Sequence, residues 1–144
     1  MSNKVESSAT FRVPPRVLYN SFLDESDLTR LSLGSKCLMD PKEGGKFSLY
    51  NGSVEGTNIS LNKNTRIEQN WRFSSWEEGV YSKVVIEFRP LIGEDDCTEV
   101  VLVQTGIPSL DKFGNPGCLE QCMLGWERNF WDRFEKIMGY PKFK

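Results

Sequence analysis

The last third of the chain carries an apolar stripe at helical spacing, and this stripe is too wide for a helix to bury alone. Its apolar residues recur every three or four positions. They are Leu119, Cys122, Met123, Trp126, Phe130, Phe134 and Ile137, and Leu124, Trp131 and Met138 widen the stripe. We expect Asn115 to cap this helix, Pro116 to start it and Gly139 to close it. Such a face must pack against a large apolar surface, and a curved antiparallel sheet is the expected one.

The preceding sequence has the alternation of such a sheet. Strands are predicted at 5–13, around 37–39, and at 46–50, 53–56, 66–73, 80–89 and 98–105. Asn51-Gly52 between two of these runs is a strong hairpin signal, because a type I′ turn needs positive φ at both central residues.

Two short helices are expected between the first strand and this meander. The first follows Pro14-Pro15, and the second is capped by Asp24 and ends at Gly34. The sequence therefore predicts one α+β domain spanning 1–144, with a first strand, two short helices, a meander of about six antiparallel strands and a long C-terminal helix.

The 144 residues include no histidine, which excludes Ser-His-Asp and Cys-His catalysis and every zinc site that uses histidine. The four cysteines, Cys37, Cys97, Cys118 and Cys122, lack paired C-x2-C spacing. We expect reduced thiols, no metal, no cofactor and no catalytic residues.

The formal net charge of −2 argues against a nucleic-acid partner. No apolar run has the length of a signal peptide or a membrane span, so no membrane association and a cytoplasmic location are expected.

The stretch WRFSSWEEG concentrates aromatic surface beside an acidic turn. Trp71 and Phe73 share a strand face with Ile67, which favours core packing. Arg72 points to the opposite face, where it can pair with an acid. Trp76 lies in a loop, and loop tryptophans either fold back onto the body of a domain or contact a partner. The sequence leaves both alternatives for Trp76 open.

Several motifs together resemble a known family. They are Gly44-Gly45-Lys46-Phe47 with Gly52 and Gly56, Trp71-Arg72-Phe73 with Trp76 and Gly79, Gln104-Thr105-Gly106-Ile107-Pro108, and Gly125-Trp126 with Gly139-Tyr140. In order and spacing they resemble the C-terminal domain of the activators of the heat-shock protein 90 ATPase. The resemblance covers about 5–140 and implies a START-like, birch-pollen-allergen-like helix-grip fold.

The resemblance implies a non-enzymatic co-chaperone, and we expect a monomer. Such a protein binds the nucleotide-binding domains of the heat-shock protein 90 dimer and stimulates or modulates the ATPase by favouring its closed state. Candidate contact residues are Trp76, Glu77, Glu78 and Arg72. Full-length activators also carry an N-terminal domain that docks on the middle segment of the chaperone. This chain, which begins at Met1, contains no counterpart of that domain, so we expect a stand-alone version of the second domain or a piece of a larger protein.

Two other functions are known on the same fold. One is a carrier or sensor of an apolar small molecule, held in a cavity between the sheet and the C-terminal helix. Candidate lining residues are Trp71, Phe73, Trp126, Phe130 and Phe134. The other is a cyclase or hydrolase, which the missing histidine disfavours.

Overall fold

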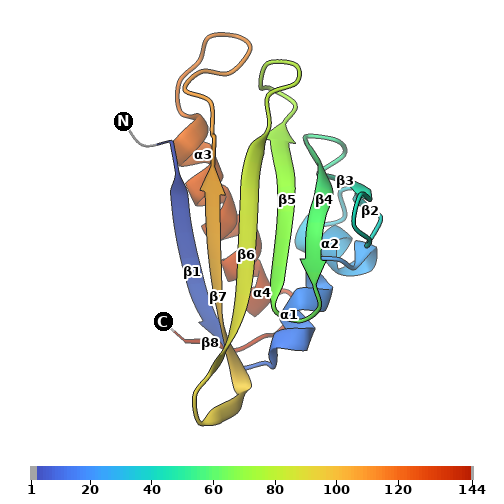
Figure 1. Ribbon diagram of the computed structural model, residues 1–144, viewed down its shortest axis with the longest axis vertical. Coiled ribbons are helices and arrows are strands. Elements are labelled where there is room, and N and C mark those ends of the chain that lie inside the picture. Colours follow the sequence, from blue (N-terminus) through green and yellow to red (C-terminus); the bar gives the residue numbers. More distant parts are fainter. Residues whose placement is uncertain (1–2, 144) are drawn as a thin grey trace.

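The protein is an antiparallel sheet wrapped around its C-terminal helix. The computed structural model describes residues 3–143, apart from the side chain of Asp95. Figure 1 views the sheet from its outer face, with the helix behind it. The elements are β1 (Val5–Phe11), α1 (Pro15–Ser21), α2 (Glu25–Leu31), β2 (Leu38–Met39), β3 (Lys46–Leu49), β4 (Val54–Asn62), β5 (Arg66–Phe73), β6 (Ser82–Leu91), β7 (Glu94–Thr105), α3 (Cys118–Gly125), the π-helical segment η1 (Trp126–Trp131), α4 (Asp132–Lys136) and β8 (Lys142–Phe143).

The predicted α+β architecture is confirmed, but the expected strand count is too low. The described residues form one eight-stranded sheet in the order β2-β3-β4-β5-β6-β7-β1-β8. The last strand, β8, follows the helix and pairs with the end of β1. It has two residues, which is too short for any alternation to show in the sequence. None of the helices in the described part of the chain is long and apolar enough to cross a membrane.

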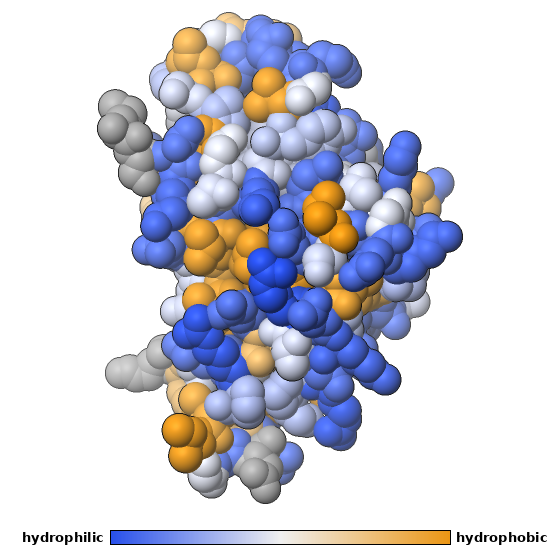
Figure 2. Space-filling model, viewed as in Figure 1, coloured by the Kyte–Doolittle hydropathy of each residue, from blue (hydrophilic) through white to orange (hydrophobic). Residues whose placement is uncertain are grey.

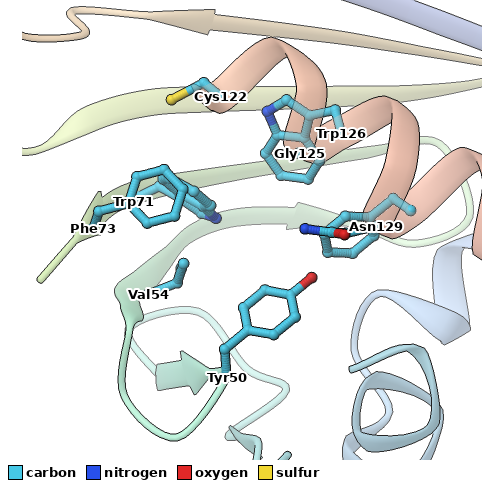
Figure 3. A pocket seen from close by; sticks show the side chains of 9 residues that line it. Tyr50, Val54, Trp71, Phe73, Cys122, Gly125, Trp126 and Asn129 are labelled. Carbon is cyan, nitrogen blue, oxygen red and sulfur yellow. The ribbon is translucent and has the colours of Figure 1, made fainter. Parts of the chain in front are cut away.

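The predicted cap of α2 and the predicted hairpin turn between β3 and β4 both form where the sequence places them. The backbone N–H of Asp27 donates to Asp24 Oδ1 (3.0 Å), so Asp24 caps α2 as predicted. Asn51 and Gly52 both have positive φ, 57° and 90°, and join β3 to β4. Tyr50 also has positive φ (53°), which is unusual for a bulky residue. This left-handed run turns the Tyr50 side chain towards the terminal helix, as Figure 3 shows.

The terminal helix starts later than the sequence predicts and ends as predicted. It begins at Cys118, after Gly117 with φ of 102°. Its N-cap is therefore Gly117, so Asn115 does not cap the helix and Pro116 does not start it. Asn115 belongs to the preceding loop, where its backbone N–H donates to Asp111 Oδ1 (2.9 Å). At the other end Gly139 has φ of 76°, and the N–H of Tyr140 donates to the carbonyl of Phe134 (3.0 Å).

The π-helical segment keeps the helix aligned with the sheet. Buried residues recur at a spacing of four: Cys118, Cys122, Trp126, Phe130 and Phe134. With 3.6 residues per turn, a step of four advances by about 40° around an α-helix, so this stripe would turn away from the sheet. The wider π turn offsets that drift, since its hydrogen bonds close one residue later. It also lets Trp131 be buried beside Phe130.

A buried polar chain fastens the helix to the sheet. The indole N–H of Trp126 donates to Gln104 Oε1 (2.8 Å), and Gln104 Nε2 donates to Ser82 Oγ (2.9 Å). Ser82 Oγ in turn donates to the carbonyl of Trp71 (2.7 Å). Each buried donor therefore has an acceptor, which fixes the rotation of the helix against β5, β6 and β7.

Candidate partner-binding surface

The loop between β5 and β6 is held by Arg72. Its guanidinium is buried, with 5% of the residue exposed, and donates to the loop carbonyls of Trp76 (2.6 Å), Glu77 (3.1 Å) and Val80 (3.2 Å). It also pairs with Glu55 Oε2 at 2.8 Å, which confirms the expected acidic neighbour. Because three loop carbonyls accept hydrogen bonds from one planar guanidinium, the loop has a fixed shape. Arg72 is therefore a support beneath the loop and does not project from it.

Trp76 folds back onto the body of the domain. Its exposed fraction is 0%, and its ring packs against the rings of Trp71 and Phe73 at centroid distances of 6.2 and 5.9 Å. Its indole N–H has no hydrogen-bond partner among the described residues. That N–H lies near the Cys118 thiol, where it slightly opposes the rise in the pKa of Cys118 that burial causes. The expectation that Trp76 is presented to a partner is thus corrected, because its ring is buried against the other aromatic rings of this stretch.

A second loop, 106–117, lies beside the first. The backbone N–H of Lys112 donates to the carbonyl of Ser75 (2.8 Å), which ties the two loops together. Within the second loop, Asp111 Oδ1 accepts hydrogen bonds from the N–H groups of Phe113 and Asn115, both at 2.9 Å. These hydrogen bonds hold the pKa of Asp111 below its usual value, and the bond from the Asn115 N–H has the largest effect. The loop is therefore ordered by its own side chain at neutral pH.

The two loops present an exposed apolar tip beside acidic residues. Phe113 is 70% exposed and Leu110 is 52% exposed, while Glu77 and Glu78 of the neighbouring loop are also exposed. We call residues 74–81 and 106–117 together the loop platform. It forms the top of the molecule in Figure 1, and Figure 2 shows apolar side chains exposed at this end.

The sequence interpretation missed Leu110 and Phe113. The signal was present: two large apolar side chains stand in a Gly-, Asn- and Pro-containing loop with no helical or strand spacing to direct them inward. An ordered loop that exposes a phenylalanine has the character of a contact site, since rigid aromatic side chains dominate binding energies. Glu77 and Glu78 remain proposed contacts.

The space between the sheet and the helix is nearly filled. Four of the five candidate lining residues, Trp71, Phe73, Trp126 and Phe130, line a small cavity with Tyr50 and Asn129 (Figure 3). Phe134 lies apart from it, packed edge-on against Phe11 and Phe22.

The centres of water molecules have about 30 Å³ available in this cavity. That is room for one or two waters, far from the several hundred Å³ of a typical small-molecule site. Burial raises the pKa of Tyr50 to about 12, so its hydroxyl stays neutral at the cavity wall. The cavity does not favour the carrier hypothesis.

Comparison with known proteins identifies the family. A family model described as "Activator of Hsp90 ATPase homolog 1-like protein" matches residues 12–139. An activator of 90 kDa heat shock protein ATPase homolog from Dictyostelium discoideum is 38% identical over 130 residues, which cover 90% of this chain and 31% of that protein. The human activator of 90 kDa heat shock protein ATPase homolog 1 is 28% identical over 137 residues, covering 95% of this chain and 37% of that protein. The chain thus spans about a third of the length of these curated relatives.

A solved structure of similar length has the same fold. The crystal structure of an HSP90 activator from Plasmodium falciparum superposes with a TM-score of 0.93 and 41% sequence identity, covering 97% of this chain and 99% of that one. The fold and the family that the sequence motifs suggested are both confirmed. The chain belongs to the family of Activator of Hsp90 ATPase homolog 1-like proteins.

Proposed function

We propose that this chain is a co-chaperone that binds the nucleotide-binding domains of heat-shock protein 90 and raises its ATPase rate by favouring the closed state. The observation that carries this proposal is the similarity to an HSP90 activator along almost the whole of both chains. The chain needs no catalytic group for this role. An activator works by binding one conformation of its target better than the other.

The size of the chain sets the expected strength of activation. Moving a two-state equilibrium from 1:99 to 99:1 needs a difference in binding free energy of about 5.5 kcal/mol. One small surface, such as the loop platform, supplies only part of that difference. We therefore expect weak stimulation by this chain alone, and stronger stimulation when it is joined to a domain that binds the middle segment of the chaperone.

The test is the ATP hydrolysis rate of heat-shock protein 90 from the same organism, titrated with this chain, with an inhibitor of the chaperone to subtract background. A saturable rise is the expected result. Binding without any rise would contradict activation by this domain alone. Absence of both binding and stimulation would reject the co-chaperone proposal.

We further propose that the loop platform is the surface that meets the chaperone, with Phe113 as its apolar anchor and Glu77 and Glu78 as its charged rim. Phe113 projects from a loop that Asp111 holds in place, so little side-chain or loop entropy is lost on binding. Trp76 and Arg72 contribute from beneath, by fixing the backbone that carries the two glutamates.

Replacing Phe113 by alanine is expected to weaken chaperone binding about 10- to 30-fold, the effect of losing about 1.4–2 kcal/mol at a contact hot spot. The measurement is the dissociation constant by calorimetry, alongside thermal unfolding of the variant. Ile92 offers a matched control. It is fully exposed in the β6–β7 hairpin, at the opposite end of the molecule in Figure 1. Ile92→Ala should leave the affinity for the chaperone unchanged. Equal effects of the two substitutions would rule out the loop platform as the chaperone-binding surface.

A further inference from the structure

The outer edge of β1 is only partly covered. Along its length β1 pairs with β7, but β8 pairs with it only at Thr10 and Phe11. The N–H of Arg12 donates to the carbonyl of Pro141 (2.7 Å), so even-numbered residues direct their backbone groups towards this edge. By that alternation, the N–H and C=O groups of Glu6 and Ser8 point outward. No strand of the described residues pairs with them there.

A groove runs beside this open edge. Residues 6–9 of β1 form one wall, and Glu127, Trp131 and Asp132 of the terminal helix form the other, with Lys142 at one end. The groove has a volume of about 350 Å³. The wall on the helix side is fixed, because Trp131 is buried and its indole N–H donates to Ser7 Oγ (2.7 Å). The groove therefore offers both unpaired backbone groups and a rigid wall.

The direction of β8 shows how an added strand would run along the groove. β8 runs antiparallel to β1, with Phe143 opposite Thr10. Continuing that register, residues of a strand added in this line would lie opposite Ser8, Ser7 and Glu6. An extended chain laid there would form the ladder that Ser8 and Glu6 lack, the mode of recognition known as strand addition.

The charges that line the groove favour a basic occupant. Its lining holds three carboxylates, on Glu6, Glu127 and Asp132, against one ammonium, on Lys142. That ammonium already pairs with Asp132 at 3.1 Å, and Glu6 pairs at 3.4 Å with Lys4 beside the groove. Among the described residues Glu127 forms no ion pair, so the carboxylates still outnumber the two lysines. A second copy of this chain would bring the same carboxylates against this set, so like charges oppose self-pairing. A strand with lysine or arginine at alternate positions would meet them favourably.

We propose that the open edge of β1 accepts an extended, basic segment of a partner chain, which continues the line of β8 and adds a strand to the sheet. The site lies along the β1 edge of the sheet, and its lining shares no residue with the loop platform. The inference therefore stands whether or not the loop platform binds a chaperone.

The test uses a blocked eight-residue peptide of alternating lysine and threonine. Two control peptides accompany it: one N-methylated at alternate backbone nitrogens, and one with glutamate in place of lysine. The basic peptide should bind with a measurable dissociation constant in a heteronuclear NMR titration, and the amide protons of Glu6 and Ser8 should become protected from exchange. The N-methylated peptide, which keeps the charge but loses the ladder, should bind about 10-fold more weakly, as should the acidic one.

Ser8 offers a matched pair of variants. Ser8→Pro removes the outward N–H and leaves the β7 ladder intact, so it should weaken the basic peptide about 10-fold, whereas Ser8→Ala keeps the N–H and should bind normally. Equal binding of the plain and N-methylated peptides would overturn strand addition, and this comparison needs no variant to fold. Failure of the basic peptide to bind, or self-association through β1 in its absence, would also overturn the proposal.

Discussion

Replacing Trp76 by alanine is expected to lower the free energy of unfolding by about 3–5 kcal/mol, the range for removing a large aromatic side chain from a core. Trp76 is fully buried, and it closes the end of the core against Trp71 and Phe73. The loss should appear as a lower midpoint of urea unfolding with little change in slope. Because the buried Trp76 side chain anchors residues 74–81 of the loop platform to the core, the variant should also expose the amides of these residues to hydrogen exchange.

Trp76→Phe is the control for this experiment. Phenylalanine keeps much of the buried ring but lacks the indole N–H, which has no hydrogen-bond partner among the described residues. Removing an unpaired buried donor offsets part of the lost packing, so the cost should stay below about 1.5 kcal/mol. A Trp76→Ala protein as stable as the wild type would show that the ring is not part of the core. Full stability together with lost chaperone binding would restore the hypothesis that Trp76 is a contact residue.

The position of Trp76 illustrates where sequence patterns stop being informative. Strand alternation correctly placed Trp71 on the buried face, because neighbouring side chains on a strand point to opposite sides. A loop has no such period, so the two alternatives for Trp76 could not be separated. The ring of Trp76 packs against Trp71 and Phe73. Arg72 holds the loop backbone in the path that allows this packing, a path that the sequence does not reveal.

The terminal helix also has features that the sequence pattern predicts and features that it does not. Its apolar stripe predicted both the helix and the sheet that it packs on, since the pattern repeats over several turns. The π-helical segment was not foreseen, although the strict spacing of four from Cys118 to Phe134 was its signal. The start of the helix was misplaced because Asn115 has two uses, as a cap or as a partner of Asp111, and local sequence does not choose between them.

The exposed apolar tip was only partly predictable. Leu110 and Phe113 have no helical or strand spacing, which indicates a loop, but only their exposure in the folded structure distinguishes them from a loop residue that folds back, as Trp76 does. The open edge of β1 likewise depends on strand order, which places the first strand beside the last long strand of the meander. Both features depend on the tertiary arrangement, which local patterns do not determine.

Replacing Arg72 by methionine is expected to lower the free energy of unfolding by about 3 kcal/mol, because three loop carbonyls lose a charged hydrogen-bond donor at once. Methionine retains an unbranched stem of similar path, so the loss reflects the guanidinium more than packing. The carboxylate of Glu55 supplies the matched comparison. Its side chain is 49% exposed, and water can replace its share of the ion pair.

Glu55→Gln should therefore cost less than about 1 kcal/mol, as other solvent-exposed ion pairs do. Chemical denaturation of both variants measures the difference, and hydrogen exchange locates it. In Arg72→Met the amides of residues 74–81 should exchange faster. The amides of the terminal helix should exchange faster only to the extent that the global stability falls. If both substitutions cost the same small amount, the loop carbonyls are held by water, and Arg72 does not fix the loop platform. If Arg72→Met alone is costly and also weakens chaperone binding, the guanidinium acts on the partner through the loop shape that it maintains.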